Sequence, residues 1–199
     1  MKGGNKQMNH FFALLSRMKY INRWGLMRNT KPENIEEHSL EVAIITHALA
    51  ELKNIRFGGN INTGRIMMLA VYHDVSEIYT GDLPTPVKYF NPEIREAYKR
   101  VENYSLEKLI SCLPSDLKND YADVLIPKEQ DKELWKIIKA ADKLSALIKC
   151  IEEEKAGNTE FKKAANAQIE SLRQMKMAEV DCFMEDFLPS YKLTLDEQE

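Results

Sequence analysis

The stretch Leu69-Ala-Val-Tyr-His73-Asp74-Val-Ser-Glu77-Ile-Tyr-Thr-Gly81-Asp82 decides the fold, because it sets ionisable side chains inside an apolar helical pattern. Gly81 is a suitable C-terminal stop, so the pattern predicts one continuous helix that ends there. In such a helix His73 and Asp74 point about 100° apart, and Glu77 projects on the same side one turn later. We therefore expect the three side chains to face one common point.

This stretch alone leaves other interpretations open. A His-Asp pair on a helix is also common as a surface pair, or as a core histidine with a satisfied hydrogen bond. Glu77 is equally compatible with a surface glutamate that pairs with a lysine. Support for a functional site must come from the rest of the chain.

Composition limits the class of protein. The chain has 199 residues, of which 44% are hydrophobic and 30% charged, which predicts a single domain over residues 1–199. Its net charge of −3 argues against a nucleic-acid-binding surface. The three cysteines lack any C-x-x-C spacing and are typical of intracellular thiols. No apolar run reaches the length of about 20 residues that a membrane span needs, so we expect a cytoplasmic protein without membrane contact.

Amphipathic runs predict an all-α fold of six or seven helices. No alternating strand pattern, glycine-rich phosphate loop or repeat is present. The helix that follows Asn34 is apolar nearly all round, which favours a central position. Residues 1–5 are expected to form a flexible leader and residues 193–199 a loose tail. The predicted helices cover residues 7–22, 34–52, 62–81, 91–113, a short segment after 116, 132–155 and 159–187.

Two further side chains qualify as metal ligands. His38 lies in the first turn of its helix, where the helix dipole favours the neutral imidazole, although, taken alone, a hydrogen bond to a neighbouring loop explains this histidine better. Asp142 interrupts the apolar stripe of the 132–155 helix, and a carboxylate there is costly to bury unless it is paired or bound to a metal. Its neighbour Lys143 points elsewhere on the helix. His10 and His47 are assigned to packing.

Two segments have the chemistry of a phosphate and sugar pocket. Arg23 and Trp24 offer a two-pronged cation beside an aromatic wall, or simply the end of an amphipathic helix. After Gly81, two prolines predict a stiff, extended path, which suits either a pocket wall or a plain connector. The residues of that path next to the helix are Asp82, Leu83, Pro84 and Thr85.

The series His38, His73-Asp74 and Asp142, spread over three helices, resembles the HD-domain metal-dependent phosphohydrolase superfamily. The sequence motifs around these residues are similar to those of one subgroup, the bacterial 5'-deoxynucleotidases. The similarity extends over nearly the whole chain, including Pro189-Ser190-Tyr191. These motifs are Asn22-Arg23-Trp24, Glu36-Glu37-His38-Ser39, Tyr72-His73-Asp74-Val75-Ser76-Glu77, Thr80 to Lys88 and Ala141-Asp142.

The resemblance implies an HD-domain helical bundle that hydrolyses deoxyribonucleoside 5'-monophosphates to deoxynucleoside and phosphate. It implies broad use of bases, selection against ribonucleotides and a homodimer. It also implies one divalent cation, such as cobalt, manganese or copper, and two imidazoles with two carboxylates suit a borderline transition metal. The implied metal ligands are His38, His73, Asp74 and Asp142.

The same resemblance implies that Arg23 orients the phosphate, and lysine should not replace it. The position of Glu77 suggests its role, because it shares the site side of the helix with His73 and Asp74 and is not needed to complete the ligand set. We expect Glu77 to orient the attacking water or accept its proton, with Asp74 as the alternative for handling that proton. The substrate-binding set is Arg23, Trp24, His38, Asp74, Asp82, Leu83, Pro84, Thr85 and Asp142.

Three rival functions stay open at this point. A guanosine tetraphosphate hydrolase or a triphosphohydrolase would need more basic residues around the pocket than the sequence offers. A regulatory HD module that only senses a nucleotide or a metal would not need an open metal site, so the intact ligand series argues against it.

Overall fold

The structure is a computed structural model that describes residues 8–199, so the expected leader over residues 1–5 lies outside the described residues. Residues 8–199 form ten α-helices, five short 3-10 helices and no β-strand, which confirms the all-α prediction. The α-helices are α1 (Phe11–Leu15), α2 (Ile35–Arg56), α3 (Thr63–Val71), α4 (Glu77–Thr80), α5 (Thr85–Lys88), α6 (Pro92–Ser111), α7 (Lys118–Leu125), α8 (Lys132–Lys155), α9 (Lys162–Met175) and α10 (Ala178–Asp186). The 3-10 helices are η1 (Met18–Tyr20), η2 (Glu129–Asp131), η3 (Thr159–Phe161), η4 (Leu188–Lys192) and η5 (Leu195–Glu197).

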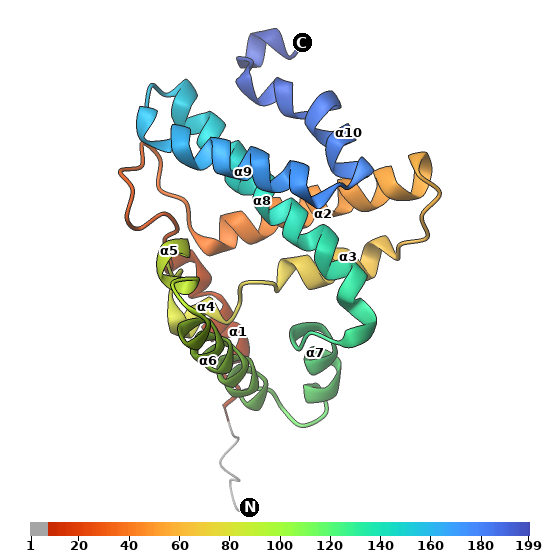
Figure 1. Cartoon of the computed structure of the whole chain (residues 1–199). Coiled ribbons are helices and arrows are strands. Elements are labelled where there is room, and N and C mark those ends of the chain that lie inside the picture. The colour runs from red at the N-terminus through yellow and green to blue at the C-terminus, as the bar shows by residue number, and fades with distance from the viewer. Residues whose placement is uncertain (1–7) are drawn as a thin grey trace, which may run out of the picture.

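Two long helices, α2 and α8, form the centre of the fold. α2 packs against α3, α8 and α10, while α8 also packs against α9, which runs beside it in Figure 1. Apolar side chains at helical spacing give each helix a face that is removed from water, and this burial is the main force that holds the helices together. The fully buried side chains of this cluster include Val42, Leu49, Ile66, Leu69, Ile137, Ile138, Leu144, Leu147, Ile148, Phe161 and Leu172.

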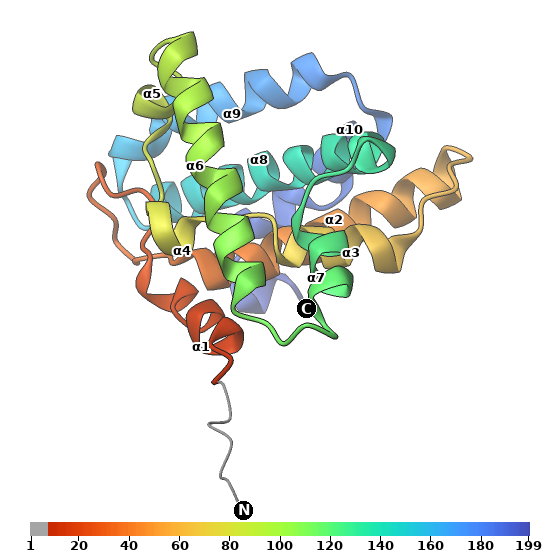
Figure 2. The same cartoon turned by 90° about the horizontal axis from the view of Figure 1, so that it is seen from below.

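A second, smaller cluster surrounds α6, which contacts α1, α4, α5 and α7. Figure 2 shows α6 crossing the direction of α8. Ile35 at the start of α2 and Val75 just before α4 belong to this cluster, so both clusters meet near the N-terminal end of α2. Its buried members are Phe11, Met18, Ile35, Val75, Leu109, Leu113 and Leu125.

Helix starts follow the local sequence signals. The Asn34 side chain accepts hydrogen bonds from the backbone N–H groups of Glu36 and Glu37, which caps α2. Asn91 caps α6 in the same way, with Pro92 as the first helical residue. These two helices therefore begin where the sequence predicts.

The prediction of one continuous helix over residues 62–81 is wrong. α3 ends at Val71 and α4 begins at Glu77, so His73 and Asp74 lie in the intervening turn. Short-range bonds replace the helical ladder there: the N–H of His73 donates to the Ala70 carbonyl at 3.3 Å, and the N–H of Glu77 donates to the Asp74 carbonyl at 3.0 Å. The turn contains no Pro or Gly, so no helix-breaking residue marks it in the sequence.

The helix count exceeds six or seven because other predicted runs are also broken. The 7–22 run becomes α1 followed by η1, and the 159–187 run becomes η3, α9 and α10. The segment after Gly81 is only partly extended: Pro84 has ψ 132°, but residues 85–88 form α5, in which Pro86 stands in the first turn.

α2 is central, but it is not buried all round. Leu40 and Ile44 are each 61% exposed, so one face of the helix carries apolar side chains into solvent. At the C-terminus, η5 covers residues 195–197 within the segment expected as a loose tail. Among the described residues no helix has both the length and the apolar character needed to cross a membrane.

Candidate metal and phosphate site

The four predicted metal ligands come from three elements that meet at the N-terminal end of α2. His38 lies in the first turn of α2, His73 and Asp74 occupy the turn between α3 and α4, and Asp142 lies in the middle of α8. The break after Val71 lets the His-Asp pair turn toward α2 instead of following a helical face. The structure thus brings together residues that are far apart in the sequence.

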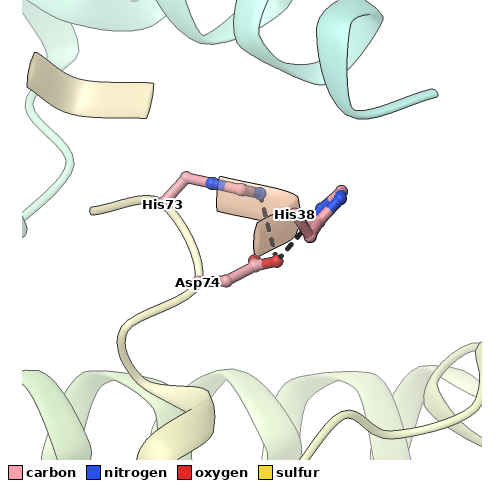
Figure 3. Close-up of side chains that lie close together, drawn as sticks. All are labelled: His38, His73 and Asp74. Carbon is pink, nitrogen blue, oxygen red and sulfur yellow. Dashed lines mark ion pairs between the residues drawn. The ribbon is translucent and has the colours of Figure 1, made fainter. Parts of the chain in front are cut away.

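His38, His73 and Asp74 each offer one ligand atom, and these atoms all lie within 4.8 Å of one another. The Asp74 Oδ2 atom is 3.0 Å from His73 Nε2 and 3.6 Å from His38 Nε2. Figure 3 marks both pairs with dashed lines. Asp142 Oδ1 approaches the same His38 Nε2 atom at 3.1 Å. Two imidazole nitrogens and the Asp74 carboxylate therefore converge on one small region, and Asp142 adjoins this group through its approach to His38.

Each of the two imidazoles has a hydrogen-bond partner at its Nδ1 atom, on the side away from Asp74. His73 Nδ1 is 2.8 Å from the Ala70 carbonyl oxygen, and His38 Nδ1 is 3.0 Å from Ser145 Oγ. The opposite nitrogens, His38 Nε2 and His73 Nε2, are buried and make no hydrogen bond within the described residues. Buried nitrogens without partners are costly unless something else satisfies them, and a cation between them and the carboxylates would do so.

The electrostatics of the cluster favour positive charge. Although burial opposes ionisation, the neighbouring His73 holds the pKa of Asp74 below its ordinary value. Burial also works against charge on His73, yet Asp74 raises the pKa of this histidine overall. Burial, assisted by Arg23, lowers the pKa of His38 and keeps its imidazole neutral. The site thus combines anionic carboxylates with a neutral donor nitrogen, as a metal site requires.

Arg23 lies beside the cluster and is held from the other side. Its Nη1 donates to Glu33 Oε2 at 2.6 Å, while Nη2 lies 3.8 Å from Asp142 Oδ1. An isolated β-bridge between Asn22 and Asn34 brings Arg23 and Glu33 together. One arm of the guanidinium fork is thus fixed, and the other faces the cluster.

Trp24 follows Arg23 in a left-handed conformation, with φ 60°, which is uncommon outside glycine. Its indole Nε1 donates to Glu33 Oε2 at 3.0 Å, and its backbone N–H donates to Asp82 Oδ2 at 3.3 Å. The indole ring packs on Phe161 with ring centroids 5.3 Å apart. These contacts explain how the strained backbone is held, and they join the Arg-Trp segment to the segment that begins at Asp82.

The other predicted site residues differ in how deeply they are buried. Glu77 is buried, and its Oε2 atom makes no hydrogen bond among the described residues. Burial, with the negative charges of Asp74 and Asp82, raises the pKa of Glu77 to about 10. Leu83 and Pro84 are half-buried, whereas the Thr85 side chain is exposed at the start of α5.

The assignment of His10 and His47 to packing is wrong, because both are exposed. His47 Nε2 lies 3.6 Å from Glu51 on the next turn of α2, so this histidine has the acidic companion that the sequence analysis did not give it. Neither histidine belongs to the His-His-Asp cluster.

Sequence reasoning missed three polar residues next to the site. Glu33 receives hydrogen bonds from Arg23 and Trp24, and Ser145 lies between His38 and Glu41. Glu33 stands in a polar turn, and Ser145 follows Asp142 by one helical turn, which was the only available signal for it. Pairings across loops and between helices are not encoded in local patterns.

Comparisons with known proteins point in one direction. A family model described as YfbR-like 5'-deoxynucleotidase matches residues 10–191. A protein of Erwinia tasmaniensis named 5'-deoxynucleotidase is 51% identical over 189 residues, covering 95% of this chain and 96% of the relative.

Solved structures have the same fold. An HD-domain phosphohydrolase of Listeria innocua matches with a TM-score of 0.75 and 29% identity, over 92% of this chain and 88% of that one. An HD phosphohydrolase of cyanophage S-2L, described as bound to dA and one catalytic Zn²⁺ ion, matches with a TM-score of 0.62 and 22% identity, over 92% and 96% of the two chains.

Proposed function

Because this chain belongs to the YfbR-like 5'-deoxynucleotidase family, and is thus a phosphoric monoester hydrolase, we propose that it hydrolyses deoxyribonucleoside 5'-monophosphates to deoxynucleoside and phosphate. It accepts all common bases and discriminates against ribonucleotides. The observation that carries the proposal is the convergence of His38, His73 and Asp74 within 4.8 Å beside the Arg23 guanidinium.

The cluster holds one divalent transition-metal ion, with His38, His73, Asp74 and Asp142 as ligands. The donor set fits such an ion, because two imidazole nitrogens that make no hydrogen bond among residues 8–199 lie beside two carboxylates. When bound, a cobalt, manganese or copper ion supplies a Lewis acid for the phosphate oxygens. The Asp142 side chain is 42% exposed, so a substrate phosphate would reach the cluster from this side.

Arg23 orients the phosphate. Glu33 holds its Nη1, so the guanidinium cannot turn away when Nη2 meets a phosphate oxygen near Asp142. The planar fork of arginine matches phosphate geometry better than the single ammonium of lysine does. Fixing the phosphate in line with an attacking water removes much of the entropic cost of the reaction.

Glu77 manages the proton of the attacking water, with Asp74 as the alternative. The carboxyl group is buried close to the charges of Asp74 and Asp82, which contribute to its pKa of about 10. A cation held beside Asp74 would oppose this effect and would favour the ionised form of Glu77. Glu77 can then orient water by hydrogen bonding and accept its proton.

Trp24 and the Asp82–Thr85 segment surround the sugar. The hydrogen bond from the Trp24 N–H to Asp82 joins the two parts of this wall, and half-buried Leu83 and Pro84 add bulk. That bulk disfavours a 2'-hydroxyl and selects deoxyribose. No comparable wall is assigned to the base, which explains the broad base use that we propose.

The test is phosphate release from a panel of nucleotides. We expect similar rates for the four common deoxyribonucleoside 5'-monophosphates and rates about 10–100-fold lower for the ribonucleotides, which is the range that exclusion of one hydroxyl group by a pocket can supply. Deoxynucleoside triphosphates and guanosine tetraphosphate serve as the alternative substrates. Faster hydrolysis of either alternative, or equal rates for ribose and deoxyribose, would contradict the proposed substrate class.

A further inference from the structure

A buried hydrogen-bond chain runs behind the candidate metal cluster. His38 Nδ1 is 3.0 Å from Ser145 Oγ, and the Ser145 hydroxyl lies 2.5 Å from Glu41 Oε2. His38 and Ser145 are both 0% exposed, while Glu41 is partly exposed and lines a surface cavity with Glu37. The hydrogen-bond chain therefore leads from the cluster, through α8, back to the partly exposed carboxylate of Glu41 on α2.

The available protons determine which group donates and which accepts in each hydrogen bond of this chain. A serine hydroxyl has one proton, and a carboxylate can only accept, so Ser145 donates its proton to Glu41. The Ser145 oxygen is then left to accept a hydrogen bond from His38, which places the His38 proton on Nδ1. A neutral imidazole with a proton on Nδ1 carries its lone pair on Nε2.

The orientation of that lone pair decides what the cluster can bind. Nε2 of His38 lies 3.1 Å from Asp142 Oδ1 and 3.6 Å from Asp74 Oδ2, so three electron-rich atoms face one another. Such an arrangement is satisfied by a cation. The other tautomer would present an N–H group to Asp142 and close the site with an ordinary hydrogen bond.

We infer that Ser145 and Glu41 are positioning residues, which hold His38 in the Nδ1–H tautomer and thereby present its Nε2 atom to a divalent cation. This inference rests on the proposed function, because it concerns the same cation. Hydrogen-bond partners behind a metal-binding histidine fix its tautomer and ring orientation in many metal sites, and losing them costs about 10–100-fold in metal affinity or activity.

His73 provides an internal comparison. Its Nδ1 faces the Ala70 carbonyl oxygen at 2.8 Å, and a backbone carbonyl can only accept a hydrogen bond. The backbone thus fixes the tautomer of His73, whereas two replaceable side chains fix that of His38. Changes at Ser145 or Glu41 should therefore affect one histidine and spare the other.

The test uses the full-length protein with the variants Ser145→Ala and Glu41→Gln. The glutamine amide of the second variant can either accept from Ser145 or donate to it, so the direction of the chain is no longer set, and the partly exposed position guards against misfolding. Glu37→Gln is the matched control, since Glu37 is an exposed residue one turn earlier on α2 that lines the same cavity. Thermal melting checks that all three proteins are folded.

Two readouts are taken without substrate. Competition with a chelator measures Mn²⁺ or Co²⁺ affinity, and we expect a loss of about 10–100-fold in Ser145→Ala, a smaller loss in Glu41→Gln and no change in Glu37→Gln. The imidazole ¹⁵N chemical shifts of the metal-free protein report the tautomer of each histidine. In both variants we expect His38 to lose the shifts of the Nδ1–H tautomer and His73 to retain them.

The outcomes separate the two proposals. Wild-type protein that binds the cation, together with variants of unchanged affinity and unchanged His38 shifts, would overturn the positioning role alone. Wild-type protein that takes up neither cation would overturn the positioning role and the proposed metal-dependent function together.

Discussion

At the scale of single residues, Glu77 has the least ordinary environment in the site. It is 7% exposed, one carboxylate oxygen lacks a hydrogen-bond partner among residues 8–199, and burial together with Asp74 and Asp82 raises its pKa to about 10. An unpaired buried carboxyl is destabilising, and strongly shifted groups of this kind concentrate at functional sites.

The change Glu77→Gln removes the proton acceptor and keeps the shape. We expect turnover of a deoxyribonucleoside 5'-monophosphate to fall by about 10²–10⁴-fold, as for a positioned acid-base group, while metal content and substrate affinity are retained. Steady-state kinetics, elemental analysis and calorimetric titration measure the three quantities. Glu107→Gln, at an exposed position on α6, is the control.

Near-normal turnover in Glu77→Gln would make this residue a bystander. Asp74 would then become the leading candidate for handling the proton.

At this scale the sequence indicated candidate ligands, but not the residues that hold them in place. His73, Asp74 and Glu77 were expected to face one point; the structure instead groups His73 and Asp74 with His38, and their role as metal ligands stays a prediction. Glu33 and Ser145 were missed, because a hydrogen bond to Arg23 across a loop and one to His38 between helices leave no periodic pattern.

At the scale of elements, the loop between η1 and α2 carries Arg23 and Trp24 and is anchored to α8 by a buried ion pair. Glu153 accepts hydrogen bonds from Lys149, from the backbone and hydroxyl of Thr30, and from Asn158. Lys149 also donates to the Lys31 carbonyl at 2.6 Å. Both members of the pair are nearly inaccessible, with side chains 4% and 1% exposed.

The change Glu153→Gln should destabilise the fold by about 3–5 kcal/mol, because it leaves the buried Lys149 charge without its partner. Urea unfolding at neutral pH measures this. Glu154→Gln, at an exposed position on the same helix, should unfold like wild type. Equal midpoints for the two variants would show that the anchor contributes nothing.

The same contact predicts a pH dependence. Burial opposes ionisation of Glu153, but hydrogen bonds from Lys149, Thr30 and Asn158 hold its pKa below the ordinary 4.5. A group whose pKa is lowered by folding stabilises the protein fully above its unfolded value and loses that contribution as pH falls. The free energy of unfolding of wild type should therefore decrease below about pH 4.5 more steeply than that of Glu153→Gln.

The break in the helix between α3 and α4 was the main structural feature that the sequence did not predict. The apolar pattern continues through Leu69, Ala70 and Val75, all of which are buried, so periodicity alone favoured an unbroken helix. The turn is stabilised by tertiary contacts, since Val75 packs in the cluster around α6 whereas Leu69 packs in the cluster around α2. One segment thus joins two clusters and must change direction between them.

At the scale of the whole molecule, apolar side chains remain exposed on two long helices. Leu40, Ile44 and Ile55 of α2 are 61–78% exposed, and Val101 and Tyr104 of α6 are 49% and 64% exposed. Exposed apolar surface of this kind is typical of proteins that associate. The homodimer and the cytoplasmic location stay predictions.

Light scattering tests the homodimer. We expect a mass close to twice the 23.0 kDa of one chain, unchanged on moderate dilution. A mass of 23.0 kDa at every concentration would contradict the homodimer and would mean that the apolar side chains of α2 and α6 stay exposed in a monomer.

We propose that the cluster of His38, His73, Asp74 and Asp142 hydrolyses deoxyribonucleotides with the help of one divalent metal ion. The most direct test is phosphate release from a deoxyribonucleoside 5'-monophosphate by chelated protein, with metal content checked by elemental analysis, before and after addition of cobalt, manganese or copper. We predict no release from the metal-free protein, recovery on reloading, and neither metal uptake nor recovery in the variant Asp142→Asn. Undiminished phosphate release from protein shown to be metal-free would mean that hydrolysis does not depend on a metal ion at this cluster.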